Sequence, residues 1–215
     1  MMRFTHNATR CLLGVVALLA IMAVPALAGQ ITANTSGVFG AGSSGGTASG
    51  STLTVGSNQI KFSSLPNEIN VNLANPGDAS NITLGVFNAT STGSGSVAGA
   101  TFTLTVNFTV PSDLSPNPST ISATLTGTIS QGASGATVVW NTTTLTLTSP
   151  TAGTYKLTIE PSTPINAPIS PDASRIRGQI TYVSAAAVPE PLTLLTLGSG
   201  LAGLAAVSAR RRKKS

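Results

Sequence analysis

Charge is scarce in this sequence, because only 8% of its 215 residues are Asp, Glu, Lys or Arg. Two of the eleven bases precede residue 11, and five form the terminal cluster Arg210, Arg211, Arg212, Lys213 and Lys214. Between these ends four bases face six acids, a net charge of −2 despite the overall formal charge of +5. Nucleic-acid binding would need the bases to be spread over the folded domain, where the charge is instead net negative. We therefore expect no nucleic-acid partner.

Histidine and cysteine are almost absent, since His6 and Cys11 are the sole examples. Both lie within residues 1–28, which have the layout of a cleaved secretory signal. The remaining chain has neither residue type, so it cannot hold a Ser-His-Asp triad, a His or Cys zinc site, or a disulfide. We expect no catalytic residues, no metal and no cofactor.

The signal prediction depends on the order of three features. A basic start is followed by an apolar stretch over residues 11–24, and then by a small-residue step at Ala26 and Ala28. This order predicts cleavage between Ala28 and Gly29. A retained membrane anchor is the alternative, and the short apolar stretch disfavours it.

Aromatic residues make up only 4% of the chain, so few rings are available to stack on a sugar. We expect the single Trp140 to lie in the core rather than to form a sugar platform. Glu68 and Glu160 could form the carboxylate pair of a glycosidase, although nothing in the sequence fixes their separation. Arg175 and Arg177 share one face of a predicted strand and could meet an anionic polymer. Solvated positions on an edge strand are the more typical use of such residues.

A two-residue alternation dominates residues 29–184, where helical periodicity is absent. Shorter alternations surround residues 121–129, 145–147, 155–159 and 180–182, with turn sequences between them. The pattern predicts seven to nine short strands in one all-β domain, an antiparallel β-sandwich or jelly-roll-like fold. The clearest example is TFTLTVNFTV, whose predicted buried face is Phe102, Leu104, Val106, Phe108 and Val110.

Turn-forming residues lie between the predicted strands. The glycine-serine tract at residues 37–51 and the proline-broken stretch at 161–172 are predicted to be loops. Asp78 and Asp113 lie in turn sequences, where they are expected to form Asx turns. No alternating Asp/Asn loop accompanies either residue, so a calcium site is not expected.

The end of the chain combines three features in a fixed order: Pro189-Glu190-Pro191, an uncharged run of 18 residues at 192–209, and the basic cluster at 210–214. As a helix the run would be about 27 Å long, which just spans a bilayer core. The bases are expected to stay on the cytoplasmic side. The domain before them would then face outward.

This order resembles the PEP-CTERM sorting signal of secreted proteins of Gram-negative bacteria, over about the last 28 residues, and we assign residues 185–215 to it. The resemblance implies that Pro189, Glu190 and Pro191 are recognised by exosortase, a membrane cysteine protease-transpeptidase. It also implies that the apolar helix is a transient inner-membrane anchor, and that the protein is tied to exopolysaccharide and biofilm formation. A GPI signal and a plain membrane anchor are the alternatives.

We therefore expect a non-enzymatic surface or extracellular-matrix protein. It would be exported through the inner membrane, anchored transiently, processed by exosortase, and located at the cell surface or outside the cell. Exopolysaccharide is the candidate partner. The alternatives are a carbohydrate-active enzyme, a carbohydrate-binding module, and an ice-binding protein that uses outward threonines on its strands.

Overall fold

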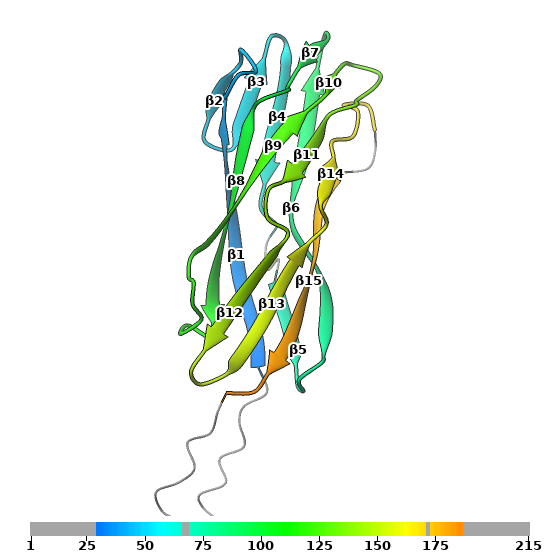
Figure 1. The fold of residues 1–215 in the computed structure, drawn as a ribbon. Coiled ribbons are helices and arrows are strands. Elements are labelled where there is room, and N and C mark those ends of the chain that lie inside the picture. Colours follow the sequence, from blue (N-terminus) through cyan, green and yellow to red (C-terminus); the bar gives the residue numbers. More distant parts are fainter. Residues whose placement is uncertain (1–28, 66–68, 171–172, 187–215) are drawn as a thin grey trace, which may run out of the picture.

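The computed structural model describes residues 29–65, 69–170 and 173–186 (Figure 1). All regular structure within these ranges is β, so the all-β prediction is confirmed for this part of the chain. No helix that could span a membrane occurs among the described residues. The predicted signal peptide at 1–28 and the predicted membrane helix at 192–209 lie outside them.

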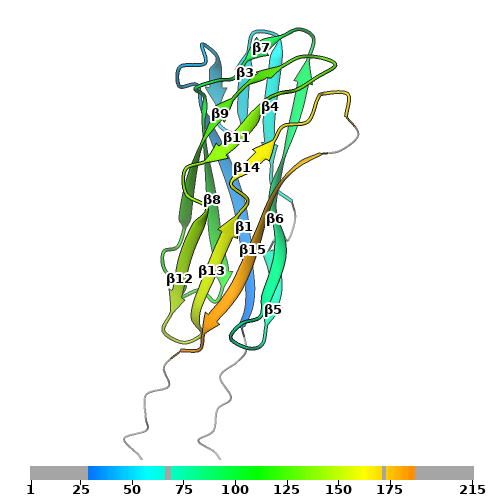
Figure 2. The same ribbon diagram turned by 45° about the vertical axis from the view of Figure 1, so that its right-hand side comes forward.

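Thirteen of the described strands form two antiparallel sheets, and the body they build is elongated (Figures 1 and 2). The six-stranded sheet has the order β14 (Ser162–Pro164), β11 (Thr137–Trp140), β9 (Ser119–Thr126), β8 (Thr101–Val110), β1 (Gly29–Gly40) and β5 (Ile69–Leu73). The seven-stranded sheet has the order β12 (Thr144–Ser149), β13 (Gly153–Ile159), β15 (Ser174–Ser184), β6 (Ala79–Ser91), β4 (Asn58–Ser63), β3 (Thr52–Val55) and β2 (Thr47–Ser49). A small third pair joins β7 (Gly95–Ser96) to β10 (Thr128–Ile129).

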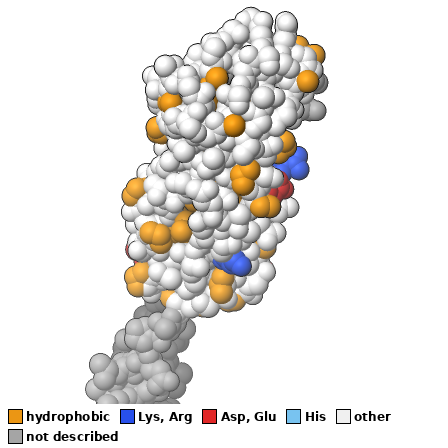
Figure 3. Space-filling model, turned by 45° about the horizontal axis from the view of Figure 1, so that its top comes forward, with side chains coloured by type: hydrophobic (Ala, Val, Ile, Leu, Met, Phe, Trp, Pro, Cys, Tyr) orange, Lys and Arg blue, Asp and Glu red, His pale blue; other side chains and the backbone are white. Residues whose placement is uncertain are grey.

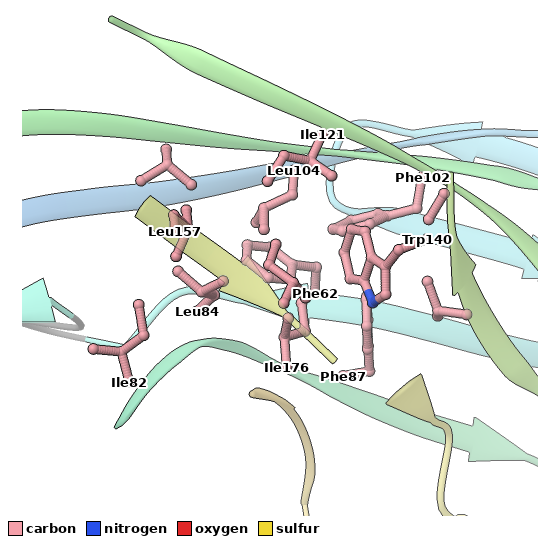
Figure 4. Close-up of a cluster of buried hydrophobic side chains, with 14 of the residues drawn as sticks. Phe62, Ile82, Leu84, Phe87, Phe102, Leu104, Ile121, Trp140, Leu157 and Ile176 are labelled. Atoms are coloured by element: carbon pink, nitrogen blue, oxygen red, sulfur yellow. The ribbon is translucent and has the colours of Figure 1, made fainter. Parts of the chain in front are cut away.

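One hydrophobic core lies between the two large sheets, because alternate side chains of most of their strands point inward. Figure 4 shows Leu104 and Ile121 from the six-stranded sheet facing Leu84, Leu157 and Ile176 from the seven-stranded sheet. These five side chains are at most 4% exposed. The alternation seen in the sequence therefore builds the inner faces of both sheets.

Aromatic rings from both sheets form the centre of this core. Neighbouring ring centroids lie 4.8 to 6.0 Å apart among Phe39, Phe62, Phe87, Phe102 and Trp140. Trp140 is 5% exposed, and its Nε1–H donates to Thr163 Oγ1 at 3.2 Å. The prediction that Trp140 is a core residue is confirmed.

The predicted inner face of β8 is confirmed except at its last residue. Val110 is 42% exposed, although alternation places it beside the buried Phe108. The pairing with β1 shifts by one residue between Thr32 and Ala33, so Val110 lies opposite Thr32 on the outer face. A β-bulge of this kind reverses the side-chain alternation beyond it.

The predicted number of strands was too low, since fifteen strands occur among the described residues. The largest omission is β1, whose inner face has large apolar side chains only near its two ends, at Ile31 and Phe39. Ala33, Thr35 and Gly37 lie between them on the same face, so the alternation is hard to recognise in the sequence. A Cβ at Gly37 would collide with the rings of Phe102 and Phe62, so the absence of a side chain is required there. The tract at 37–51, predicted to be a loop, contributes the end of β1 and all of β2.

Candidate functional site

Most of the predicted site residues lie outside the described residues. These are Ala26 and Ala28, the Pro189-Glu190-Pro191 step, and the cluster Arg210, Arg211, Arg212, Lys213 and Lys214. Gly29 is described: it is the first residue of β1 and is buried. A Cβ at this position would collide with the Tyr155 hydroxyl. Tyr155 stacks on Tyr182 at 4.8 Å, and burial raises the pKa of its hydroxyl.

Charge is divided unequally between the two sheets. The six-stranded sheet contains no Asp, Glu, Lys or Arg in its described strands. Lys61, Lys156, Arg175 and Arg177 all lie on strands of the seven-stranded sheet, and Glu160 directly follows β13. The surface in Figure 3 accordingly shows few charged side chains, while hydrophobic ones are scattered rather than gathered.

Two adjoining hollows on the outside of the seven-stranded sheet contain most of the clustered charge. Their volumes are about 610 Å³ and about 620 Å³, and both are lined by Glu160 and Arg177. We call the two together the β15 groove. Its main polar side chains are Asn81, Glu160, Asn166, Arg175, Arg177 and Gln179.

Sheet register explains how these side chains meet. Gln179 on β15 pairs with Thr158 on β13 and with Asn81 on β6, which places the three side chains in one row. The Gln179 amide donates to Asn81 Oδ1 at 3.3 Å. Two residues along β15, Arg177 pairs with Thr83, and the Glu160 N–H donates to the Arg177 carbonyl at 3.1 Å. Glu160 and Arg177 are therefore cross-strand neighbours on the outer face.

The groove opens because the chain changes sheets at this point. β13 ends at Ile159, opposite Gly178, and the chain then passes through Glu160 and Pro161 into β14 of the six-stranded sheet. The Pro161 carbonyl accepts a hydrogen bond from the backbone N–H of Trp140 at 3.1 Å, which holds the crossing segment to that sheet. The first residues of β15 consequently pair with β6 alone.

Both arginines point out of the sheet at this opening. Ile176 between them is fully buried, while Arg175 and Arg177 are exposed, as expected from alternation. The register with β6 shifts between the two arginines, at the position of Gly85, whose φ is +129°. The prediction that the arginines are solvated is confirmed, but β15 as a whole lies between β13 and β6 rather than at an edge.

The second hollow of the groove is also lined by Pro164, Asn166 and Ala173, which lie between β14 and β15 or at the end of β14. The Asn166 N–H donates to Ser174 Oγ at 2.7 Å, and Ser174 is only 4% exposed. Both residues line the second hollow together with Arg175. From the stretch at 161–172, predicted to be a loop, Pro161, Pro164 and Asn166 line the groove, and Ser162–Pro164 form strand β14.

The described lining residues of the groove include groups suited to binding a polar ligand. Glu160 is the single carboxylate among its described lining residues, whereas a glycosidase uses a pair. Glu68, its predicted partner, lies outside the described residues. No group of three metal-binding side chains occurs in the part of the chain that the structure describes. Two guanidinium groups beside one carboxylate and several amides can recognise a polar, anionic ligand.

A second polar cluster joins the two sheets near one sheet edge. Asp113, in the loop between β8 and β9, accepts hydrogen bonds from Thr151 Oγ1 at 2.7 Å and Ser149 Oγ at 2.8 Å. The bond from Thr151, aided by the one from Ser149, lowers the pKa of the Asp113 carboxyl. Ser115 and Thr148 exchange two backbone hydrogen bonds of 2.9 Å beside it.

These contacts indicate a structural role for both turn aspartates. Asp113 ties the β8–β9 loop of one sheet to the β12–β13 turn of the other. Asp78 lies in a turn as expected, but its hydrogen bond is not that of an Asx turn, because its Oδ2 accepts the N–H of Asn75, three residues earlier, at 2.7 Å.

The outer face of the six-stranded sheet is uncharged and rich in hydroxyl groups. Ser36, Thr105 and Thr120 form one row across β1, β8 and β9, and Thr32 and Thr109 are hydrogen-bonded at 2.7 Å. The described Phe, Tyr and Trp side chains are all buried, so the described surface offers no aromatic ring to a sugar. This face therefore offers hydroxyl and amide groups together with the exposed side chains of Val38, Val110 and Val139.

Comparison with known proteins gives no match to a protein-family model, a curated protein or a solved structure.

Proposed function

We propose that the protein is a non-enzymatic surface or extracellular-matrix protein, exported and then sorted through its C-terminal tail by exosortase. The proposal assigns the domain at 29–184 to the antiparallel β-sandwiches, with a jelly-roll-like topology as the finer expectation. Exopolysaccharide is the proposed partner. No catalytic residue, metal or cofactor is part of this function.

The observation that carries the proposal is the order of the last residues. Pro189-Glu190-Pro191 precedes an apolar run and then five bases, after an N-terminal segment with the layout of a secretory signal. The flanking prolines disfavour a regular helix at Glu190 and favour an extended backbone, which is the form that proteases recognise. A permanent anchor requires only the apolar length and the bases.

The arrangement of the domain supports export and display. The start of β1 and the end of β15 lie at the same end of the elongated body (Figures 1 and 2). Gly29 packs against Tyr155, which pairs with Tyr182 near the end of β15. A domain attached at this end would present its remaining length to the surroundings. We call this end the attachment pole.

The test replaces Pro189, Glu190 and Pro191 with alanine in the native host. The apolar run at 192–209 stays intact, so a permanent anchor would behave as before. If exosortase reads the Pro-Glu-Pro step, the variant accumulates as an uncut form in the inner membrane, which fractionation and immunoblotting detect. Removal of residues 210–214 is the control, because it disturbs orientation or retention in either case.

Normal maturation of the triple-alanine protein would overturn the exosortase assignment. The same result would leave export itself intact, since the N-terminal segment is unchanged. The two parts of the proposal are thus tested separately.

A further inference from the structure

We propose that the β15 groove binds a carboxylated glycan, with Arg175 and Arg177 holding its carboxylates and Glu160 accepting hydrogen bonds from its hydroxyl groups. The inference deepens the proposed association with exopolysaccharide and rests on that function for its biological setting.

The charges in the groove favour an anionic ligand. Arg175 and Arg177 are the two described arginines, and both are exposed on the same face of β15. A guanidinium group presents paired N–H donors that match the two oxygens of a carboxylate. With Glu160 beside them, the described lining residues have a net charge of +1, which favours an anion without making a broad basic surface.

The remaining polar groups favour a sugar as the carrier of that carboxylate. Asn81 and Gln179 lie in the row next to Glu160 and Arg177, so amides and a carboxylate stand beside the guanidinium groups. A sugar acid presents hydroxyl groups next to its carboxylate, and these are the partners that such side chains require. Each hollow, at about 610 and 620 Å³, has the size of a small-molecule site, and the two adjoin. A short oligosaccharide could therefore occupy both.

Neutral glycans and nucleic acids fit the groove less well. Sites for neutral ligands gain much of their affinity from hydrophobic and aromatic lining, whereas the aromatic side chains of the described residues are buried. Nucleic-acid binding requires many phosphate contacts and often stacked rings. The other described bases, Lys61 and Lys156, do not line either hollow of the groove.

The groove also stands away from the attachment pole. Arg175 lies nine residues before Ser184, where β15 ends at that pole. At the rise of an extended strand this separation is roughly 30 Å. A glycan chain could therefore reach the groove while the domain is attached at its pole.

The experiment measures binding of trigalacturonate, with maltotriose as the neutral trisaccharide of the same size. The full chain is purified in nonionic detergent, with residues 210–214 replaced by glutamine so that the tail bases do not bind the anion. Isothermal titration compares this protein with its Arg175→Gln, Arg177→Gln variant. The matched control is Lys61→Gln, Lys156→Gln, which removes the same charge from exposed positions on the same sheet.

We expect trigalacturonate to bind, maltotriose to bind at least about tenfold more weakly, and the arginine variant to lose about tenfold or more in affinity. The lysine variant should stay within about twofold. Equal losses in the two variants, equal binding of the two sugars, or no binding of trigalacturonate would overturn the inference. So would a short duplex DNA that binds as tightly through the same arginines.

A second measurement needs no groove variant. Phenylglyoxal modifies exposed arginines, and mass spectrometry identifies the modified positions. Bound trigalacturonate should protect Arg175 and Arg177 in this protein, and unchanged modification would contradict the inference. A negative result in the binding experiments would contradict glycan binding but not the processing of the tail. Normal maturation of the triple-alanine protein would contradict exosortase processing but not glycan binding.

Discussion

Asp113 shows how one carboxylate can join two sheets and make their junction sensitive to acid. Its hydrogen bonds from Thr151 and Ser149 lower its pKa in the folded protein. A carboxyl whose folded pKa is depressed stabilises the fold above the unfolded pKa, which is about 3.9. This contribution is lost as the pH falls through the folded pKa.

We therefore predict that Asp113→Ala lowers the free energy of unfolding at pH 7 by about 1 kcal/mol or less, because the site is solvent-screened. Urea unfolding at several pH values should show the variant and the wild type converging as the pH falls below about 4. Thr151→Val should lose part of the same contribution. A difference that is equally large at pH 7 and at pH 3 would show that the carboxylate charge plays no part.

Gly37 shows how a missing side chain can be required by the core. A Cβ at this position would come within 3.0 Å of atoms in the rings of Phe102 and Phe62, which are at most 3% exposed. We predict that Gly37→Ala destabilises the protein by about 1–3 kcal/mol through overpacking. Gly132→Ala is the control, since nothing lies within 4 Å of a Cβ there. Urea midpoints of the two variants should differ clearly, and equal midpoints would contradict the packing argument.

At the scale of the strand, the sequence predicts what alternation alone controls. The inner residues of β8 and β9 follow the two-residue period and are large and apolar, so they could be predicted. β1 could not, because the middle of its inner face is built from the small residues Ala33, Thr35 and Gly37, and Gly37 fits beneath neighbouring rings whose positions only the fold supplies. Val110 was misplaced for a related reason, since a bulge depends on pairing with another strand.

The β15 groove depends even more on tertiary structure. The exposure of Arg175 and Arg177 follows from alternation, but their meeting with Glu160 follows from the passage of the chain between sheets at Pro161. No local pattern marks that passage as a change of sheet. The pairing of Glu160 with Glu68, suggested by residue type alone, would have missed the arginines.

At the scale of the whole molecule, the predicted cleavage position lies directly before the first described residue, Gly29. The cleavage step is predicted to end at Ala28, and β1 begins at the next residue, which pairs with Leu73 and packs under Tyr155. The attachment pole therefore includes the position where the mature chain would start. Export, and later processing of the tail, would act on the two chain ends that leave this pole.

We predict that the exported protein begins at Gly29, and N-terminal mass spectrometry of the protein recovered outside the cytoplasm tests this directly. Small residues at Ala26 and Ala28 are what a signal peptidase accepts, so Ala28→Arg should block cleavage and leave a product heavier by residues 1–28. Ala33→Gly is the control, because it lies within β1, beyond the cleavage step, and should start at the same residue as the wild type. Recovery of Met1 on the wild-type protein outside the cytoplasm would contradict the signal-peptide assignment. A mature start several residues beyond Gly29 would contradict the cleavage position, since it would remove the part of β1 that pairs with β5.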